Sequence, residues 1–248
     1  MAQAIEAPAA PPGRERKQTP LNDPISAPVS HPHPPQRRAA GALLIAGPVI
    51  YFLAEFIAAA AWTDPPYSYT YHFISNLGVR GPSVLFGQTM LSPLAWVMNS
   101  GFFLFGITIL PGVVLLRGLS GWRRGSVLVT GALLAFGGVM LALHPGSAEE
   151  MEHGSGHALG AMAAFIGGNA LAIQLGRMHR RVGLSPKLGR WLIGLGVFGL
   201  LSLVAYFVDI SSDVNTLLGL VERGIVDPFL VGLICAGVSI WKRPTVDP

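Results

Sequence analysis

The sequence predicts an all-α fold: an integral membrane bundle of six transmembrane helices. Apolar residues make up 51% of the 248 residues, and charged residues make up only 12%. A soluble domain contains about 25% charged residues. The mean hydropathy of +0.51 agrees with a chain that is mostly embedded in lipid. Six apolar stretches divide the sequence, and the segments that join them alternate between basic and almost free of Lys and Arg.

Each apolar stretch has the length that a membrane-spanning helix needs. The stretches are 18 to 24 residues long. An α-helix rises 1.5 Å per residue, so about 20 residues cross the hydrocarbon core of a bilayer. These stretches predict a single transmembrane domain over residues 39–241, with spans at 39–62, 94–116, 126–143, 157–175, 191–210 and 224–241.

The positions of Lys and Arg predict how the bundle is oriented. Fifteen of the 17 Lys and Arg residues lie in the N-terminal tail, the second and fourth connections and the C-terminal tail. Only Arg80 and Arg223 lie on the other side. Lys and Arg are retained on the cytoplasmic side of membrane proteins. The sequence therefore predicts a multi-pass protein of the cell membrane with both termini, including the tail 242–248, in the cytoplasm.

The first 38 residues differ from the rest of the chain. They hold nine of the 20 prolines and no apolar run of the length found in a signal peptide. A Pro-rich segment with so few apolar residues cannot bury a core. We expect residues 1–38 to be a disordered cytoplasmic tail.

Glu55 is the most informative single residue. It lies seven residues before Trp62, so about 10 Å below the outer end of the first predicted helix. A carboxylate at that depth is costly unless it has a partner or takes up a proton. Glu55 is therefore either a ligand, base or proton carrier, or a structural residue that is protonated or paired with Arg80 or Arg223.

Histidines gather on the predicted outer side and suggest a metal site. Ser147 and Glu150 form a capping box that predicts a helix in the third connection. If that helix continues, His153 and His157 lie four residues apart on one face, where two imidazoles can share a zinc ion. The predicted metal ligands are His72, His144, His153 and His157.

Each of these histidines also has an ordinary interpretation. His153 can be a solvated loop residue and His157 an interfacial one, and His144 can cap the end of its helix. A haem held between His144 and His157 is a third reading of the same residues. The zinc interpretation therefore stays one alternative among several.

Further polar residues lie at the same predicted level. Glu55, Ser75 and Asp227 are the candidate catalytic groups, while Asn76, Asn99, Asn169 and Arg223 are candidates for structural hydrogen bonds within the bundle. Arg223 and Asp227 are four residues apart, the spacing of a local ion pair on a helix. The single cysteine, Cys235, excludes an intramolecular disulfide and is expected to be buried.

Several short motifs occur in the order found in a known family. They are Ile-Ser-Asn-Leu-Gly at 74–78, Met98-Asn99 in the second span, and His157 at the start of the fourth. On these residues the chain resembles the prokaryotic membrane family catalogued as domain of unknown function 998, over about residues 40–241. The resemblance implies a six-span bundle and brings no established activity.

A more distant likeness is to intramembrane metal-dependent hydrolases of the ceramidase type, which use a Ser, an Asp and three His. His72, Ser75, His153 and His157 offer the same residue types. Those enzymes have seven spans, and this chain has six.

Two functional hypotheses follow. The first is a non-enzymatic membrane protein with an extracytoplasmic-facing polar pocket that binds lipid, assists transport or organises the envelope. The alternative is a zinc-dependent hydrolase that acts on a lipid-like substrate. Membrane lipids are the expected partners. Nucleic acid is not, because the cations flank the spans and form no basic patch with interleaved aromatic residues.

Overall fold

The computed structural model describes residues 34–153, 156–212 and 217–242. The greater part of the predicted tail, residues 1–33, and residues 243–248 lie outside the described part. Within these described residues, six helices are long and apolar enough to cross a membrane, which confirms the predicted all-α membrane bundle. They are α1 (Pro34–Ala61), α2 (Ala95–Val114), α3 (Gly121–Leu143), α5 (Gly156–Arg177), α7 (Pro186–Ser211) and α8 (Leu218–Lys242).

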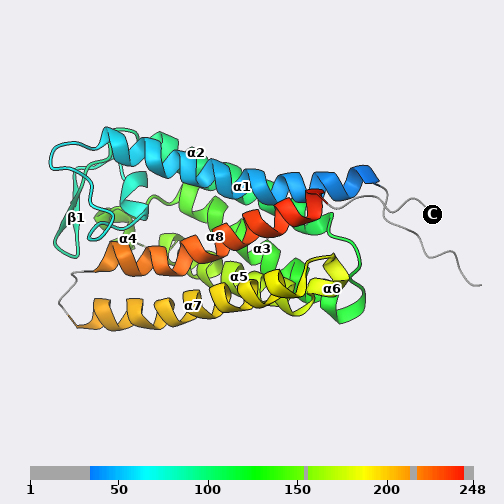
Figure 1. Ribbon diagram of the computed structural model, residues 1–248. Coiled ribbons are helices and arrows are strands. Elements are labelled where there is room, and N and C mark those ends of the chain that lie inside the picture. Colours follow the sequence, from blue (N-terminus) through cyan, green and yellow to red (C-terminus); the bar gives the residue numbers. More distant parts are fainter. Residues whose placement is uncertain (1–33, 154–155, 213–216, 243–248) are drawn as a thin grey trace, which may run out of the picture. The chain divides into compact units, whose positions relative to one another are not determined.

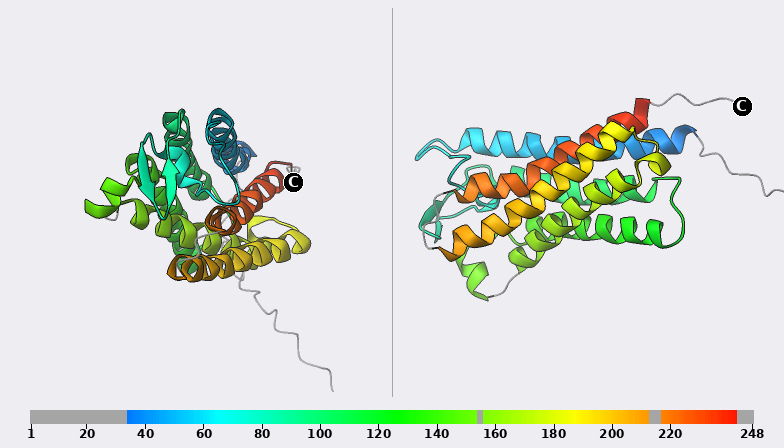
Figure 2. Two further views of the ribbon diagram at one scale, coloured as in Figure 1. Left: turned by 90° about the vertical axis from the view of Figure 1, so that its left-hand side faces the viewer. Right: turned by 60° about the horizontal axis from the view of Figure 1, so that its bottom comes forward.

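The six helices do not contribute equally to the core. Helices α1, α2, α3, α5 and α8 pack in that order around one interior, and α8 closes the ring against α1. Helix α7 packs outside the ring, against α5 and α8 (Figures 1 and 2). Only 17% of the α7 span is buried, compared with at least 44% of each other span. The interior of the bundle is therefore the space enclosed by the five ring helices.

Small residues allow the helices to approach closely. A Cβ atom added to Gly137 of α3 would lie 2.6 Å from the carbonyl oxygen of Gly160 on α5. A Cβ atom on Gly237 of α8 would lie 2.7 Å from the carbonyl oxygen of Gly41 on α1. Such contacts supply packing energy where lipid provides no hydrophobic drive for helices to associate.

Shorter elements gather at one end of the bundle. This end, called the loop end below, holds the 3₁₀ turn η1 (Ser75–Gly78), the hairpin strands β1 (Ser83–Leu85) and β2 (Gln88–Met90), and α4 (Ala148–His153) (Figure 1). The strands are antiparallel and Ser83 faces Met90. The remaining short helix, α6 (His179–Val182), lies at the opposite end.

The hairpin was not predicted. Its turn is formed by Phe86 and Gly87, which both have positive φ, at 51° and 72°. Each strand has three residues, too short a run for an alternating apolar pattern to show.

Several helices begin earlier than the hydropathy of the sequence predicts. Helix α1 starts at Pro34, within the segment expected to be a tail, and α7 starts at Pro186. Proline is well suited to the first turn of a helix, and the Ser185 hydroxyl caps α7 by accepting from the Leu188 N–H at 3.2 Å. Hydropathy detects only the part of a helix that lies in the hydrocarbon core of the bilayer. The helix itself continues through charged residues for as long as its backbone hydrogen bonds continue.

Two other expectations differ from the structure. A helix does begin after Ser147, but α4 ends at His153 and α5 begins at Gly156. His153 and His157 therefore belong to different helices and do not share one continuous helical face. Cys235 is exposed on α8 instead of buried.

Candidate functional site

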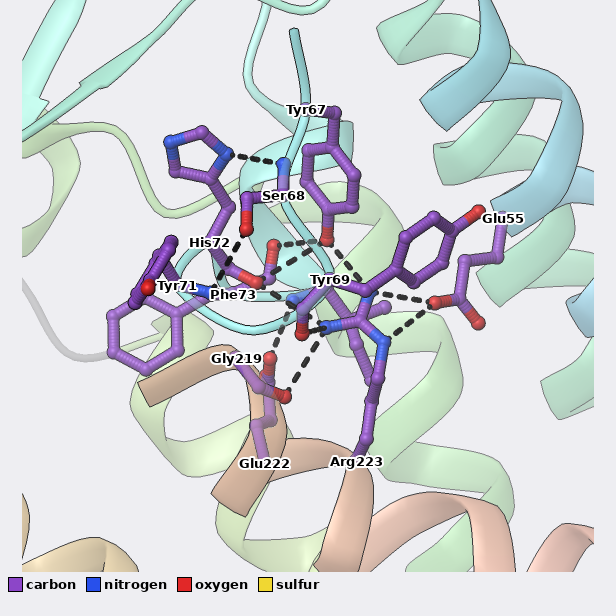
Figure 3. A network of polar contacts seen from close by, with 11 residues as sticks. Glu55, Tyr67, Ser68, Tyr69, Tyr71, His72, Phe73, Gly219, Glu222 and Arg223 are labelled. Atoms are coloured by element: carbon purple, nitrogen blue, oxygen red, sulfur yellow. Dashed lines mark hydrogen bonds and ion pairs between the residues drawn. The ribbon is translucent and has the colours of Figure 1, made fainter. Parts of the chain in front are cut away.

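A buried arginine organises the loop end of the bundle. The Arg223 Nη2 donates to Glu55 Oε1 at 2.7 Å and to the Tyr67 hydroxyl at 2.7 Å, and its Nε donates to the same Glu55 oxygen at 3.1 Å. Its Nη1 donates to the carbonyl oxygens of Tyr69, His72 and Gly219 at 2.9, 3.2 and 3.1 Å (Figure 3). Every nitrogen of the guanidinium group thus has an acceptor. We call this arrangement the Arg223 clamp.

The clamp joins three separate parts of the chain. Glu55 comes from α1, Arg223 from the first turns of α8, and Tyr67 from the connection between α1 and α2. Glu55 is 2% exposed and Arg223 is 8% exposed. The guanidinium also lies 4.6 Å from the centroid of the Tyr69 ring, a favourable cation–π distance. A buried charge with this set of partners is satisfied in a low-dielectric environment.

The clamp extends into the backbone of the first connection. The Tyr67 hydroxyl donates to the Phe73 carbonyl oxygen at 2.9 Å. Glu222, beside Arg223, accepts a hydrogen bond from the N–H of Ile74, and the N–H of Leu220 donates to the carbonyl of Thr70 at 3.0 Å. The start of α8 therefore binds the connection through both its side chains and its backbone.

Burial favours the neutral forms of two titratable side chains of the connection. Burial raises the pKa of the Tyr67 phenol, although the neighbouring Arg223 acts in the opposite direction. Burial lowers the pKa of His72, and the charge of Arg223 lowers it further. The Nδ1 of His72 accepts from the Ser68 N–H at 2.9 Å, and its ring stacks on Trp62 with centroids 5.5 Å apart. His72 thus packs and orders the connection.

The Ile-Ser-Asn-Leu-Gly motif forms the turn η1 and is fixed from several sides. The Asn76 amide donates to Gln88 Oε1 of β2 at 2.6 Å, and the Asn99 amide of α2 donates to the carbonyl oxygen of Gly78 at 2.9 Å. With the bond from Ile74 to Glu222, the turn is tied to α2, α8 and the hairpin. The motif therefore needs the amide of Asn76 for the bond to Gln88. It needs a glycine at 78 because a Cβ atom there would overlap the Asn99 side chain.

The turn η1 separates two spaces. On its inner side, Ser75 lines an enclosed cavity of about 20 Å³ together with Tyr51 and Glu222. A cavity of that size admits a water molecule and no substrate. On its outer side, Gly78 lines an open groove of about 700 Å³.

The open groove, called the α2–α3 groove below, lies between these two helices and the first connection. Its polar wall consists of Arg80, Asn99 and Ser100, and its apolar walls consist of Ala95, Trp96, Phe103, Leu104, Ala142, Leu143 and Pro145, with Gly78. Trp96, Phe103 and Leu104 are 62%, 41% and 41% exposed. The polar groups of the groove thus come from the first connection and the first two turns of α2, and Phe103 and Leu104 continue the groove as an apolar surface farther along that helix.

The candidate catalytic residues are in different surroundings. The carboxylate of Glu55 forms an ion pair with Arg223, and Ser75 lines the small inner cavity. Arg223 forms its ion pair with Glu55, not the i, i+4 pair with Asp227 that the spacing suggests. The Oδ1 atom of Asp227 is buried without a hydrogen-bond partner. None of these positions opens directly onto the groove.

Asn169 connects helices within the core. Its amide donates to the carbonyl oxygens of Phe165 on α5 and Ile225 on α8, at 2.8 and 3.1 Å. The amide nitrogen therefore bridges these two helices, while Oδ1 is buried without a partner.

Two of the four predicted metal ligands come together. The Nδ1 of His157 lies 2.7 Å from the carbonyl oxygen of His144. A Cβ atom on Gly156 would lie 2.7 Å from the His144 ring, so the end of α3 and the start of α5 are in close contact here. The side chain of His153 lies outside the described residues. Among the described side chains, no three His, Cys, Asp or Glu are arranged to hold a metal ion.

Three residues of this region have roles that the sequence did not predict. Tyr67 and Glu222 hold the first connection, and Arg80 lines the groove. The run Tyr67-Ser68-Tyr69-Thr70-Tyr71 was a usable signal, because tyrosines concentrate at the membrane surface. A single arginine in a loop gives no such signal.

Replacing Glu55 with Gln should destabilise the protein strongly. The substitution leaves Arg223 buried beside a neutral amide, and removal of one partner from a buried ion pair costs about 3–5 kcal/mol. The free energy of unfolding, measured by SDS titration of the purified protein, should fall by that amount.

The matched control is Glu152→Gln, which removes an exposed carboxylate at the same end of the bundle. It should leave the free energy of unfolding within about 0.5 kcal/mol of the wild-type value. Equal stabilities of the two variants would contradict a structural role for the Glu55–Arg223 pair.

Comparison with known proteins agrees with the membrane architecture. No curated protein and no solved structure matches this chain. One family matches residues 45–239, a range that begins in α1 and ends in α8 and contains the clamp, the turn η1 and the groove. This six-span membrane protein belongs to the family described as a protein of unknown function (DUF998).

Proposed function

We propose that this protein binds a membrane lipid in the α2–α3 groove and acts without catalysing a reaction on it. The observation that carries the proposal is the composition of the groove. It has a volume of about 700 Å³, a polar wall at the loop end and exposed apolar side chains along the helices. A lipid has the same division between a polar headgroup and apolar chains.

The arrangement of the groove favours entry from the membrane. The α2 residues Trp96, Ser100, Phe103 and Leu104 recur at helical spacing on one face, and that face rises about 12 Å from Trp96 to Leu104. Two of these side chains, Phe103 and Leu104, are apolar and exposed where the helix crosses the bilayer. One acyl chain can lie along this face while the headgroup remains at the level of η1.

The orientation of the bundle supports binding from the outer leaflet. Arg117, Arg123, Arg124 and the cations of α6 lie at the end opposite the groove. Retention of Lys and Arg in the cytoplasm would then place the groove on the extracytoplasmic side of the cell membrane, with both termini inside. A lipid-binding role at the envelope, including assistance to lipid transport, is compatible with that placement.

A bulky side chain in the groove should displace the lipid. Ser100 is exposed and lines the groove, so Ser100→Trp places an indole ring there without entering the core. Native mass spectrometry of the detergent-purified protein should show at least about a fivefold lower fraction with tightly bound lipid, a loss of about 1 kcal/mol in binding.

The control is Val129→Trp, the same substitution at a position on α3 that is 60% exposed and outside the groove. Its lipid occupancy should equal that of the wild type. Wild-type occupancy in Ser100→Trp would refute the proposal that the groove is the lipid site.

The zinc-dependent hydrolase is the alternative function, and one observation favours it. His144 and His157 lie together at the loop end, and His153 lies between them in sequence. A zinc ion there would lower the pKa of a bound water and so supply a nucleophile for hydrolysis.

Elemental analysis decides this alternative. If His144 and His157 hold zinc, protein purified without chelator contains about one zinc per chain, and His157→Ala loses it. A metal content that is low and the same in wild type and His157→Ala would rule the hydrolase out.

A further inference from the structure

We infer that the lipid in the α2–α3 groove has an anionic phosphodiester headgroup and that Arg80 binds it. This inference rests on the proposed lipid-binding function and specifies the ligand of the same site. It depends on Arg80, on the residues that position it, and on the lack of acidic side chains among the described residues that line the groove.

Arg80 is the cation at the loop end whose charge is not balanced. Of the Lys and Arg residues that the structure describes, only Arg80 and Arg223 lie at this end of the bundle. Arg223 is neutralised by Glu55. Arg80 is exposed, and within the described part of the chain it makes no ion pair and no side-chain hydrogen bond. The described residues that line the groove with it include no Asp and no Glu.

The backbone that presents Arg80 is held on both sides. The preceding residue, Val79, accepts a hydrogen bond from the Ser92 N–H at 2.9 Å. The following residue, Gly81, has a φ of 67° and lies so close to the Met90 carbonyl that a Cβ atom would overlap it. A ligand that binds Arg80 therefore orders only its side chain, because the backbone is already fixed, and this reduces the entropic cost of binding.

The chemistry of the groove fits one phosphodiester. A guanidinium forms strong, charge-assisted hydrogen bonds with phosphate oxygens. The hydroxyl group of Ser100 offers a second polar contact on the same wall. One unbalanced positive charge matches the single negative charge of a phosphodiester, and the apolar side chains of Trp96, Phe103 and Leu104 accept the attached acyl chain.

The same lining disfavours a zwitterionic lipid. An ammonium group attached to the phosphate would lie close to Arg80, and none of the described lining residues is a carboxylate that could balance it. Like charges at short range in a poorly hydrated site repel each other. The groove should therefore prefer phosphatidylglycerol to phosphatidylethanolamine when the acyl chains are identical.

Competition between two defined lipids tests the inference. The delipidated full chain is mixed with equal amounts of dioleoyl phosphatidylglycerol and dioleoyl phosphatidylethanolamine, and the bound lipids are counted by native mass spectrometry. The wild type should bind phosphatidylglycerol about tenfold more, which corresponds to about 1.4 kcal/mol. In Arg80→Gln the preference should fall to less than about twofold, and Arg80→Lys should keep part of it because a point charge remains.

Arg123→Gln is the matched control. It removes one partly exposed cation that lies over the ring of an exposed tryptophan, Trp122, at the opposite end of the bundle. It should keep the tenfold preference. If Arg80→Gln keeps the wild-type preference, or if Arg123→Gln loses as much of it, the inference is wrong.

The outcomes separate this inference from the function on which it rests. If Ser100→Trp leaves lipid binding unchanged, the groove is not the lipid site and both ideas fail. If Ser100→Trp removes the lipid but Arg80→Gln keeps the preference for phosphatidylglycerol, the lipid site stands and only the assignment of its headgroup fails. Competition by inorganic phosphate alone would show an anion site that does not need the lipid, and would also overturn the inference.

Discussion

A charged guanidinium within a membrane domain is stable only when its charge is balanced and its N–H groups have acceptors. Arg223 meets both conditions by drawing Glu55 from α1 and three backbone carbonyls to itself. Because those carbonyls belong to α8 and to the first connection, the same interaction that satisfies the charge also fixes the connection over the bundle. The hydrogen-bond acceptors that one buried arginine requires thus determine the geometry of the loop end.

The groove depends on this arrangement although Arg223 does not line it. The first connection continues from the clamp into the turn η1, where Glu222 binds Ile74 and Asn99 binds Gly78. Arg80 follows two residues later on the wall of the groove. Glu55 and Arg223 are therefore positioning residues, and the residues that would contact a lipid are on α2, on α3 and after η1.

The amino-acid sequence predicts the class of fold well. Each span is a long apolar run, and hydropathy alone locates it. The ends of the helices were less accurate, because Arg190 and the pair Glu222 and Arg223 lie in regular helix although they are charged. Such residues are excluded from an apolar stretch, and only the structure shows that they lie in the first turns of α7 and α8.

The site was harder to predict than the fold. Span order places Glu55, His72, His144 and Asp227 at one end of the bundle but does not give the direction in which each side chain points. The structure pairs Glu55 with Arg223, packs His72 within the first connection, and brings His144 close to His157 instead. The depth of Glu55 correctly indicated that it needs a partner, and Arg223 was one of two candidates. Arg80 could not be identified as unpaired until the partner of Glu55 was known.

The most direct test of the account uses Arg223→Lys, which keeps the positive charge beside Glu55 but has too few N–H groups to bind the carbonyls of the connection. Hydrogen–deuterium exchange of the purified protein measures the result. We predict that amides of residues 70–79 exchange at least about tenfold faster than in the wild type, a loss of about 1.4 kcal/mol of local stability, while amides of α3 are unchanged. Unchanged exchange at residues 70–79 would contradict the claim that Arg223 holds the first connection in place.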